Sequence, residues 1–221
     1  FTVFELSKVI RALPGTKTEE IQETIDALKT LIVSTLEKSI EYPMNGTHVE
    51  APRVYDSFAR IVRKIIKDAQ PRQTVSILTF NYDIALDLAL LQNDVTPDYH
   101  LDPKGAVNNG AIPLLKLHGS LNWGVRDDPT NDIHPLDIQS YINSPRRHWV
   151  DSDKMTRIHI GTNIQATFKR AGLDVRKLPL LVPPSWNKAD YHVALTNVWE
   201  NAARHLSDAE RIFVIGYSLP E

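Results

Sequence analysis

The sequence predicts an α/β fold in which helices cover both faces of a parallel sheet. After residue 71, short apolar runs alternate with segments of helical periodicity. Such near-continuous apolar runs are typical of parallel strands that are buried on both faces. Before residue 71 the periodicity is helical, which predicts a helical module ahead of the sheet. With 221 residues, of which 42% are apolar, the chain is long enough to bury one sizeable core.

The helical module, residues 1–70, contains two amphipathic segments. In the first, apolar residues recur every three or four positions, and Thr18 precedes two glutamates that suit a first helical turn. The second carries four cations opposite its apolar stripe, which we interpret as a solvated face. The first stripe is Ile21, Ile25, Leu28, Ile32, Leu36 and Ile40, and the second is Val54, Phe58, Ile61, Val62, Ile65, Ile66 and Ala69.

The sheet is expected to come from two stretches, residues 71–121 and 179–221, with an insertion at 122–178 between them. A structureless loop of this length is rare in a compact domain, so we expect the insertion to hold helices or a small subdomain. The expected strands are 75–80, 112–117, 178–182 and 212–215, and the expected helices are 84–91 and 188–206.

Composition excludes several classes of function. The formal net charge of -2 gives no basic footprint for direct nucleic-acid binding. The absence of cysteine excludes thiolate zinc sites, iron–sulfur clusters and thiol nucleophiles. No apolar run approaches the roughly 20 residues of a membrane span, and no targeting segment is recognisable, so we expect a cytoplasmic protein without membrane contact. Asn45-Gly46-Thr47 matches a glycosylation triplet but is expected to form a turn.

Polar or small residues directly follow three of the expected strands. Because the ligand crevice of an open parallel sheet lies beyond the carboxyl ends of its strands, these residues form the candidate site. Each also has a structural interpretation: Asn81 or Asp83 can cap the next helix. His118 can be a hydrogen-bonded core histidine, and Gly216 can relieve a tight turn. The three triplets are Asn81-Tyr82-Asp83, His118-Gly119-Ser120 and Gly216-Tyr217-Ser218.

Three segments, in this order, resemble the successive motifs of the sirtuin-like superfamily. The similarity covers roughly residues 74–221 and is closest to the bacterial NAD-hydrolysing domains used in anti-phage defence. It implies a Rossmann-like fold with NAD as the substrate. The segments are Thr79-Phe80-Asn81-Tyr82-Asp83, Leu117-His118-Gly119-Ser120-Leu121-Asn122-Trp123 and Phe213-Val214-Ile215-Gly216-Tyr217-Ser218-Leu219-Pro220.

The resemblance also implies roles for single residues. His118 falls on the family's catalytic histidine, and Asn81 on an asparagine near the nicotinamide ribose. Asp83 falls near the nicotinamide amide, while Phe80 and Tyr82 replace the Gln and Ile of the family motif. A turn that faces the adenosine half of NAD matches Gly216 and Ser218. The expected catalytic residues are thus Asn81 and His118, and the expected NAD-binding residues are Thr79, Phe80, Asp83, Gly119, Gly216, Tyr217 and Ser218.

The function implied by the resemblance is hydrolysis of NAD+ to nicotinamide and ADP-ribose by the effector of an anti-phage defence system. A second copy of the chain, or a sensor domain, is the expected protein partner. In this interpretation His118 accepts a proton from water or a ribose hydroxyl, and Asn81 holds that water or hydroxyl. Two alternatives stay open: an NAD-dependent protein deacylase, and a nucleotide-binding or assembly module without turnover.

The chain departs from the family pattern in two ways. None of its nine glycines stands in a Gly-x-Gly arrangement, so we expect the family's first strand and glycine-rich loop to lie upstream of Phe1. The four zinc cysteines of deacetylase sirtuins are absent, and residues 122–178 stand in their place. His134, His148 and His159 lie in this insertion, but their spacing resembles no metal site, so no metal is expected.

Overall fold

The computed structural model describes residues 18–69, 74–101, 110–126, 132–142, 148–150, 153–160, 168–173, 180–181 and 189–216. The helices are α2 (Thr18–Ser39), α3 (Arg53–Asp68), α4 (Ala85–Gln92), α5 (Ile138–Ile142) and α7 (Ala189–Ser207). The strands are β1 (Tyr42–Asn45), β2 (His48–Val49), β3 (Ile77–Thr79), β4 (Pro97–Asp98), β5 (Ile112–Lys116), β6 (Trp123–Val125), β7 (Ile133–Pro135), β8 (His148–Trp149) and β9 (Arg157–His159).

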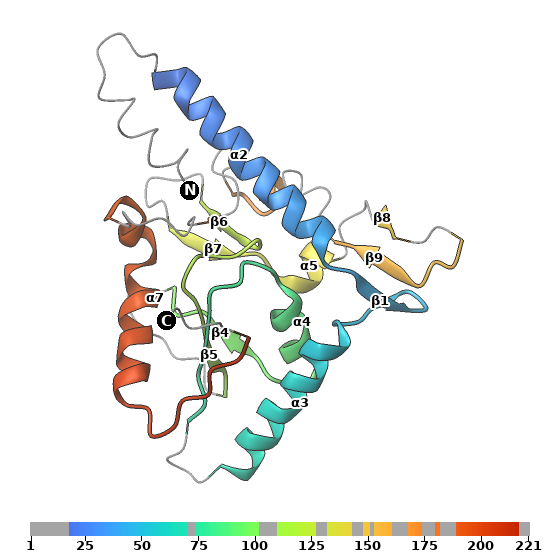
Figure 1. Ribbon diagram of the computed structural model, residues 1–221, viewed down its shortest axis with the longest axis vertical. Coiled ribbons are helices and arrows are strands. Elements are labelled where there is room, and N and C mark those ends of the chain that lie inside the picture. The colour runs from blue at the N-terminus through green and yellow to red at the C-terminus, as the bar shows by residue number, and fades with distance from the viewer. Residues whose placement is uncertain are drawn as a thin grey trace.

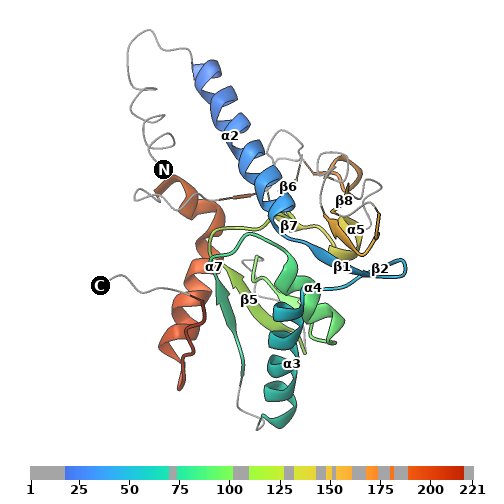
Figure 2. The same ribbon diagram turned by 45° about the vertical axis from the view of Figure 1, so that its right-hand side comes forward.

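A parallel three-stranded sheet in the order β3-β5-β4 lies between two layers of helices (Figure 1). Successive side chains of a strand point to opposite faces, and β5 shows this directly. Leu114 belongs to the core shared with α4, whereas Leu115 and Leu117 belong to the core shared with α7. Figure 2 shows α7 on one side of β5 and α4 with α3 on the other. The prediction of a mixed α/β fold with helices on both faces of a parallel sheet is confirmed.

Helix α4 is the most deeply buried helix segment described. Ala85, Leu88, Ala89 and Leu90 are at most 1% exposed, because α4 lies between the sheet and α3. A helix with apolar residues on most of its surface is stable only when neighbouring elements cover it. Each buried leucine contributes about 2 kcal/mol of hydrophobic stabilisation. This burial fixes the loop before α4, which carries three of the expected site residues.

The first seventy residues are not purely helical, because a β-hairpin joins α2 to α3. Asn45 pairs with His48 in this hairpin, and Gly46 has a φ of 59°, so the predicted turn at Asn45-Gly46-Thr47 is confirmed. The prediction of a helical module did not include the short strands at Tyr42–Val49 that flank this turn. Pro43 and the neighbouring glycine turn break helical periodicity here, and the short strands give too few residues for a recognisable alternation.

The insertion is tied to the first seventy residues. β9 pairs with β1, which gives a four-stranded antiparallel sheet in the order β2-β1-β9-β8. Ile158 and Phe168 are at most 1% exposed and belong to the same apolar core as α3 and α4. The described parts of the insertion, which include the β6-β7 ribbon and the short α5, therefore pack on the main core.

Two expected strands are not formed among the described residues. Residues 212–215 have no regular structure, and Ile212, Phe213, Val214 and Ile215 are 60–79% exposed. A strand requires a neighbour that satisfies its backbone hydrogen bonds, and no described strand pairs with this segment. Of the expected strand 178–182, only residues 180–181 are described, and Leu181 makes a single antiparallel bridge with Gly119.

Helix α3 also differs from its expectation in which residues it buries. The predicted apolar stripe contains Val54 and Ile61, but these side chains are 80% and 58% exposed. Ala59 and Val62 are the residues of this helix that are buried. The surface of α3 that packs against α4 is therefore narrower than the apolar stripe predicted for α3. No helix in the described part of the chain is long and apolar enough to cross a membrane.

Candidate functional site

The loops that follow β3 and β5 lie side by side and are joined by hydrogen bonds. The Leu117 amide donates to the Thr79 carbonyl at 2.9 Å, and the Leu121 amide donates to the Tyr82 carbonyl at 2.9 Å. The Ser120 hydroxyl oxygen lies 3.3 Å from the same Tyr82 carbonyl oxygen. Because β3 and β5 are parallel neighbours, their carboxyl ends meet at one edge of the sheet. The structure thus brings together two of the three expected triplets.

His118 lies against two aromatic rings of the loop after β3. Its ring centroid is 5.1 Å from that of Phe80 and 5.9 Å from that of Tyr82. The histidine is 9% exposed, whereas Phe80 is 46% exposed. Phe80 therefore forms the outer wall of the imidazole site. Burial raises the pKa of Tyr82 to about 12, so its phenol stays protonated at neutral pH.

Asn81 is exposed at the tip of this loop. Its backbone amide donates to the Thr79 hydroxyl at 3.1 Å, which tightens the turn out of β3. Burial and the Asp83 charge raise the pKa of Tyr55 of α3, and the nearby Asn81 side chain partly offsets this rise. Tyr55 could not be recognised from the sequence, because it lies outside the apolar stripe predicted for α3.

The Asp83 carboxylate satisfies an amide at the start of helix α4, although the N-cap position itself is Ile84. Its Oδ1 accepts a hydrogen bond from the Ala85 amide at 2.9 Å. The carboxyl is 8% exposed, and burial raises its pKa, while the nearby charge of Lys116 partly lowers it. A helix cap and a ligand contact are compatible, because the second carboxylate oxygen remains an acceptor.

A small cavity opens beside Asp83, under the last turns of α2. Its volume is about 10 Å³, which is room for one water molecule. Burial raises the pKa of Tyr42 well above its ordinary value, and the charges of Asp83 and Asp87 raise it further. A nicotinamide ring is much larger than one water molecule, so it enters this cavity only if α2 or the loop moves. The lining residues are Leu36, Glu37, Ile40, Tyr42, Asp83, Ile84, Leu121 and Ile160.

The Asp83 carboxyl gives a testable pH dependence of stability. Its folded-state pKa is raised, so the native chain binds this proton at a higher pH than the unfolded chain does. The free energy of unfolding therefore falls as pH rises from about 3.8 through the folded-state value. Asp83→Asn keeps the cap and removes the titration, so it should remove this fall in urea unfolding measured across acidic pH. An unchanged pH profile would contradict the assignment.

Gly119 has a structural reason to be glycine. Its φ is 89°, and a Cβ atom there would lie 1.9 Å from the carbonyl oxygen of Leu180. The Ser120 amide donates to this same carbonyl at 3.1 Å, so the Leu180 backbone crosses directly over the turn. Gly119 was predicted to contact NAD, but this face of its Cα is occupied by Leu180.

The third expected triplet is not brought to this site in the described structure. Gly216 has a φ of 67° and is exposed, and a Cβ atom added to it would meet no atom within 4 Å. It follows the exposed segment 212–215, which has no strand pairing. Tyr217 and Ser218 lie outside the described residues.

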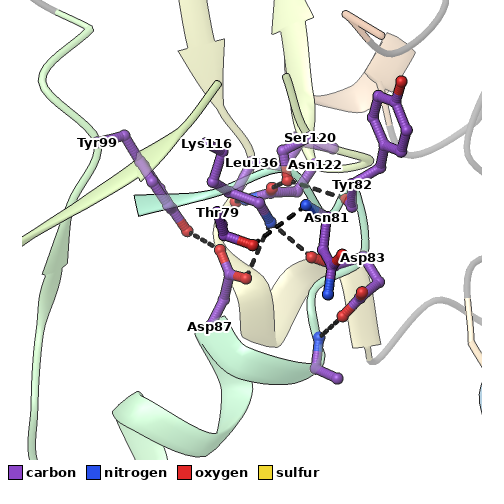
Figure 3. A network of polar contacts seen from close by, with 11 residues as sticks. Thr79, Asn81, Tyr82, Asp83, Asp87, Tyr99, Lys116, Ser120, Asn122 and Leu136 are labelled. Carbon is purple, nitrogen blue, oxygen red and sulfur yellow. Dashed lines mark hydrogen bonds and ion pairs between the residues drawn. The ribbon is translucent and has the colours of Figure 1, made fainter. Parts of the chain in front are cut away.

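A buried ion pair lies directly beneath the two loops (Figure 3). Lys116 and Asp87 are 1% and 0% exposed, and Lys116 Nζ lies 3.0 Å from Asp87 Oδ2. The Lys116 ammonium also donates to the Asp83 carbonyl at 2.5 Å, and the Tyr99 hydroxyl donates to Asp87 Oδ1 at 2.6 Å. Within the loop after β5, Asn122 Oδ1 accepts a hydrogen bond from the Ser120 hydroxyl at 2.7 Å. Sequence reasoning missed this network, since Lys116 stands inside an otherwise apolar run.

The described residues contain no group of three His, Cys, Asp or Glu side chains that could hold a metal ion. His159, one of the histidines in the insertion, has its Nδ1 3.0 Å from the Ile40 carbonyl oxygen. This contact ties β9 to the end of α2. Compared with known proteins, the chain matches no family model and no curated sequence.

Proposed function

We propose that the chain is an NAD+ glycohydrolase domain with a Rossmann-like fold that cleaves NAD+ to nicotinamide and ADP-ribose. The observation that carries the proposal is the meeting of the Asn81 and His118 loops at the carboxyl edge of β3 and β5. Polar groups that are far apart in the sequence then lie on neighbouring loops at the edge where open parallel sheets bind their ligands. The motif resemblance supplies the identity of the ligand.

The chemistry of this reaction suits these side chains. Cleavage of the bond between nicotinamide and ribose develops positive charge at the anomeric carbon, and nicotinamide is already a good leaving group. The site must therefore hold a nucleophilic oxygen and a base in a dry pocket. His118 is the base, and Asn81 orients the water or the ribose hydroxyl. Asp83 accepts a hydrogen bond from the nicotinamide carboxamide with the carboxylate oxygen that does not cap α4.

Two side chains from β1 and α3 support the site. Tyr55 of α3 lies near the Asn81 side chain, and Tyr42 of β1 lines the cavity next to Asp83. The effector role in anti-phage defence, the cytoplasmic location and a partner that triggers the domain belong to the same proposal. They rest on the resemblance to bacterial NAD-hydrolysing domains.

Substitution of the proposed base gives the direct test. His118→Ala should lower nicotinamide release from NAD+ by about 100-fold to 10,000-fold, as expected for loss of a general base. Asn81→Ala should lower it less, because it removes positioning only. His134→Ala is the matched control, since this histidine lies in the β6-β7 ribbon. Folded His118→Ala protein that releases nicotinamide at the wild-type rate would refute the proposal.

The small cavity favours a second candidate, a nucleotide-binding module without turnover. A site that holds one water molecule beside Asp83 is closed to a nicotinamide ring. If the cavity beside Asp83 stays closed, NAD+ binds through its adenosine half and is not cleaved. Binding of NAD+ without any nicotinamide release distinguishes this candidate from the glycohydrolase.

A further inference from the structure

We infer that Lys116 is a positioning residue, whose ammonium group clamps the loop that carries Asn81 against the loop that carries His118. The inference rests on the proposed function, because the site that Lys116 positions is the one proposed there. Lys116 has no role in the motif resemblance. It follows from the buried polar network beneath the two loops (Figure 3).

The geometry places Lys116 between the two loops. It lies at the end of β5, two residues before His118, and its Nζ donates to the carbonyl of Asp83, two residues after Asn81. One hydrogen bond of 2.5 Å therefore links the two proposed catalytic segments. Asp87 of α4 holds the ammonium group from the other side at 3.0 Å, and the Tyr99 hydroxyl holds Asp87.

Stability alone does not explain a charged pair at this place. Removing two charges from water is unfavourable, and apolar residues of similar size often give an equally stable or more stable core. Lys116 and Asp87 are at most 1% exposed, so solvent does not reduce that penalty. What the pair adds is a strong, directed donor that reaches from the central strand to a backbone carbonyl of the neighbouring loop.

A backbone hydrogen bond from the Leu121 amide to the Tyr82 carbonyl also joins the two loops, but it lies above the ion pair and leaves the Asp83 end of the loop to Lys116. The Asn81 amide bonds to Thr79, and the Asp83 carboxylate bonds to Ala85, so both contacts join close neighbours in the sequence. Two of the three ammonium protons of Lys116 are used by Asp83 and Asp87. Lys116 therefore acts through the loop, and His118 and Asn81 act on the ligand.

The test replaces the whole network by apolar residues of similar size. The variant K116M/D87L/Y99F removes both charges of the ion pair together, so it should unfold in urea at a concentration close to that of the wild type. Loss of the bond to Asp83 should speed hydrogen exchange of the backbone amides of residues 81–85 by roughly 10-fold to 100-fold, as expected for a charged donor. Nicotinamide release should fall by a similar factor. Tyr99→Phe alone keeps the clamp and should leave both measurements within about twofold of wild type.

A second variant covers the case in which the apolar variant does not fold. K116Q/D87N keeps a neutral polar pair, but the Gln side chain is one bond shorter and cannot reach the Asp83 carbonyl as lysine does. It should show the same faster exchange at residues 81–85, with exchange in α7 unchanged. Wild-type exchange at these amides in either folded variant would overturn the clamp, even if nicotinamide release fell. Faster exchange in a chain whose wild-type form releases no nicotinamide would support the clamp and refute the proposed function.

Discussion

Lys116→Met should destabilise the chain by about 3 to 5 kcal/mol, one of the two largest effects we expect. The substitution leaves the Asp87 carboxylate buried with 0% exposure and without its cation. Breaking a buried pair by removing one partner leaves an uncompensated charge, which costs this much. Urea unfolding, followed by circular dichroism, measures the difference.

The exposed ion pair between Arg63 and Asp94 provides a matched control. Its N–O distance is 2.7 Å, but the two side chains are 39% and 78% exposed. Water screens such pairs, so Arg63→Met should change the free energy of unfolding by less than about 1 kcal/mol. If Lys116→Met and Arg63→Met lower the free energy of unfolding equally, the burial of Lys116 does not determine the effect of its substitution.

Gly119→Ala is the second large effect, and we expect a loss of more than about 3 kcal/mol. A Cβ atom at this position would overlap the Leu180 carbonyl oxygen at 1.9 Å, and both atoms belong to the backbone or are fixed to it. The turn after β5 must therefore shift, and His118 shifts with it. We expect the variant to lose nicotinamide release as well as stability.

Gly110→Ala separates the effect of the clash from that of the backbone conformation. Gly110 has the same φ of 89°, but an added Cβ atom there meets nothing within 4 Å. Its substitution should lower the free energy of unfolding only by the cost of placing alanine in a left-handed conformation, about 1 to 2 kcal/mol. If both alanine variants lose the same amount of stability, the close approach of Leu180 does not matter.

Local patterns in the sequence predicted most of the central sheet and its helices. β3, β5, α4 and α7 lie where the apolar runs and helical periodicities placed them, because the apolar side chains of each element pack against its neighbours. The meeting of the Asn81 and His118 loops followed from one rule, that parallel strands end at the same edge of a sheet. The positions of the two strands in the sequence, and the residues that follow each strand, were sufficient for that inference.

Contacts between distant segments could not be predicted in the same way. The pairing of β1 with β9 joins residues that are more than a hundred positions apart, and neither strand has a strong pattern. Residues 212–215 are as apolar as β5, yet they are exposed, since a strand depends on a neighbour and not on its own composition. Lys116 and Tyr55 gave no signal because a polar side chain shows its role only through partners in space.

A shared site around His118 predicts a specific response to NAD+. In nuclear magnetic resonance spectra of the imidazole rings, the His118 resonances should shift on titration with NAD+, and those of His134 and His205 should stay in place. The eight histidines of the chain can be assigned by single substitutions. Saturation with NAD+ that leaves His118 unperturbed while another histidine shifts would show that the ligand binds away from the two loops.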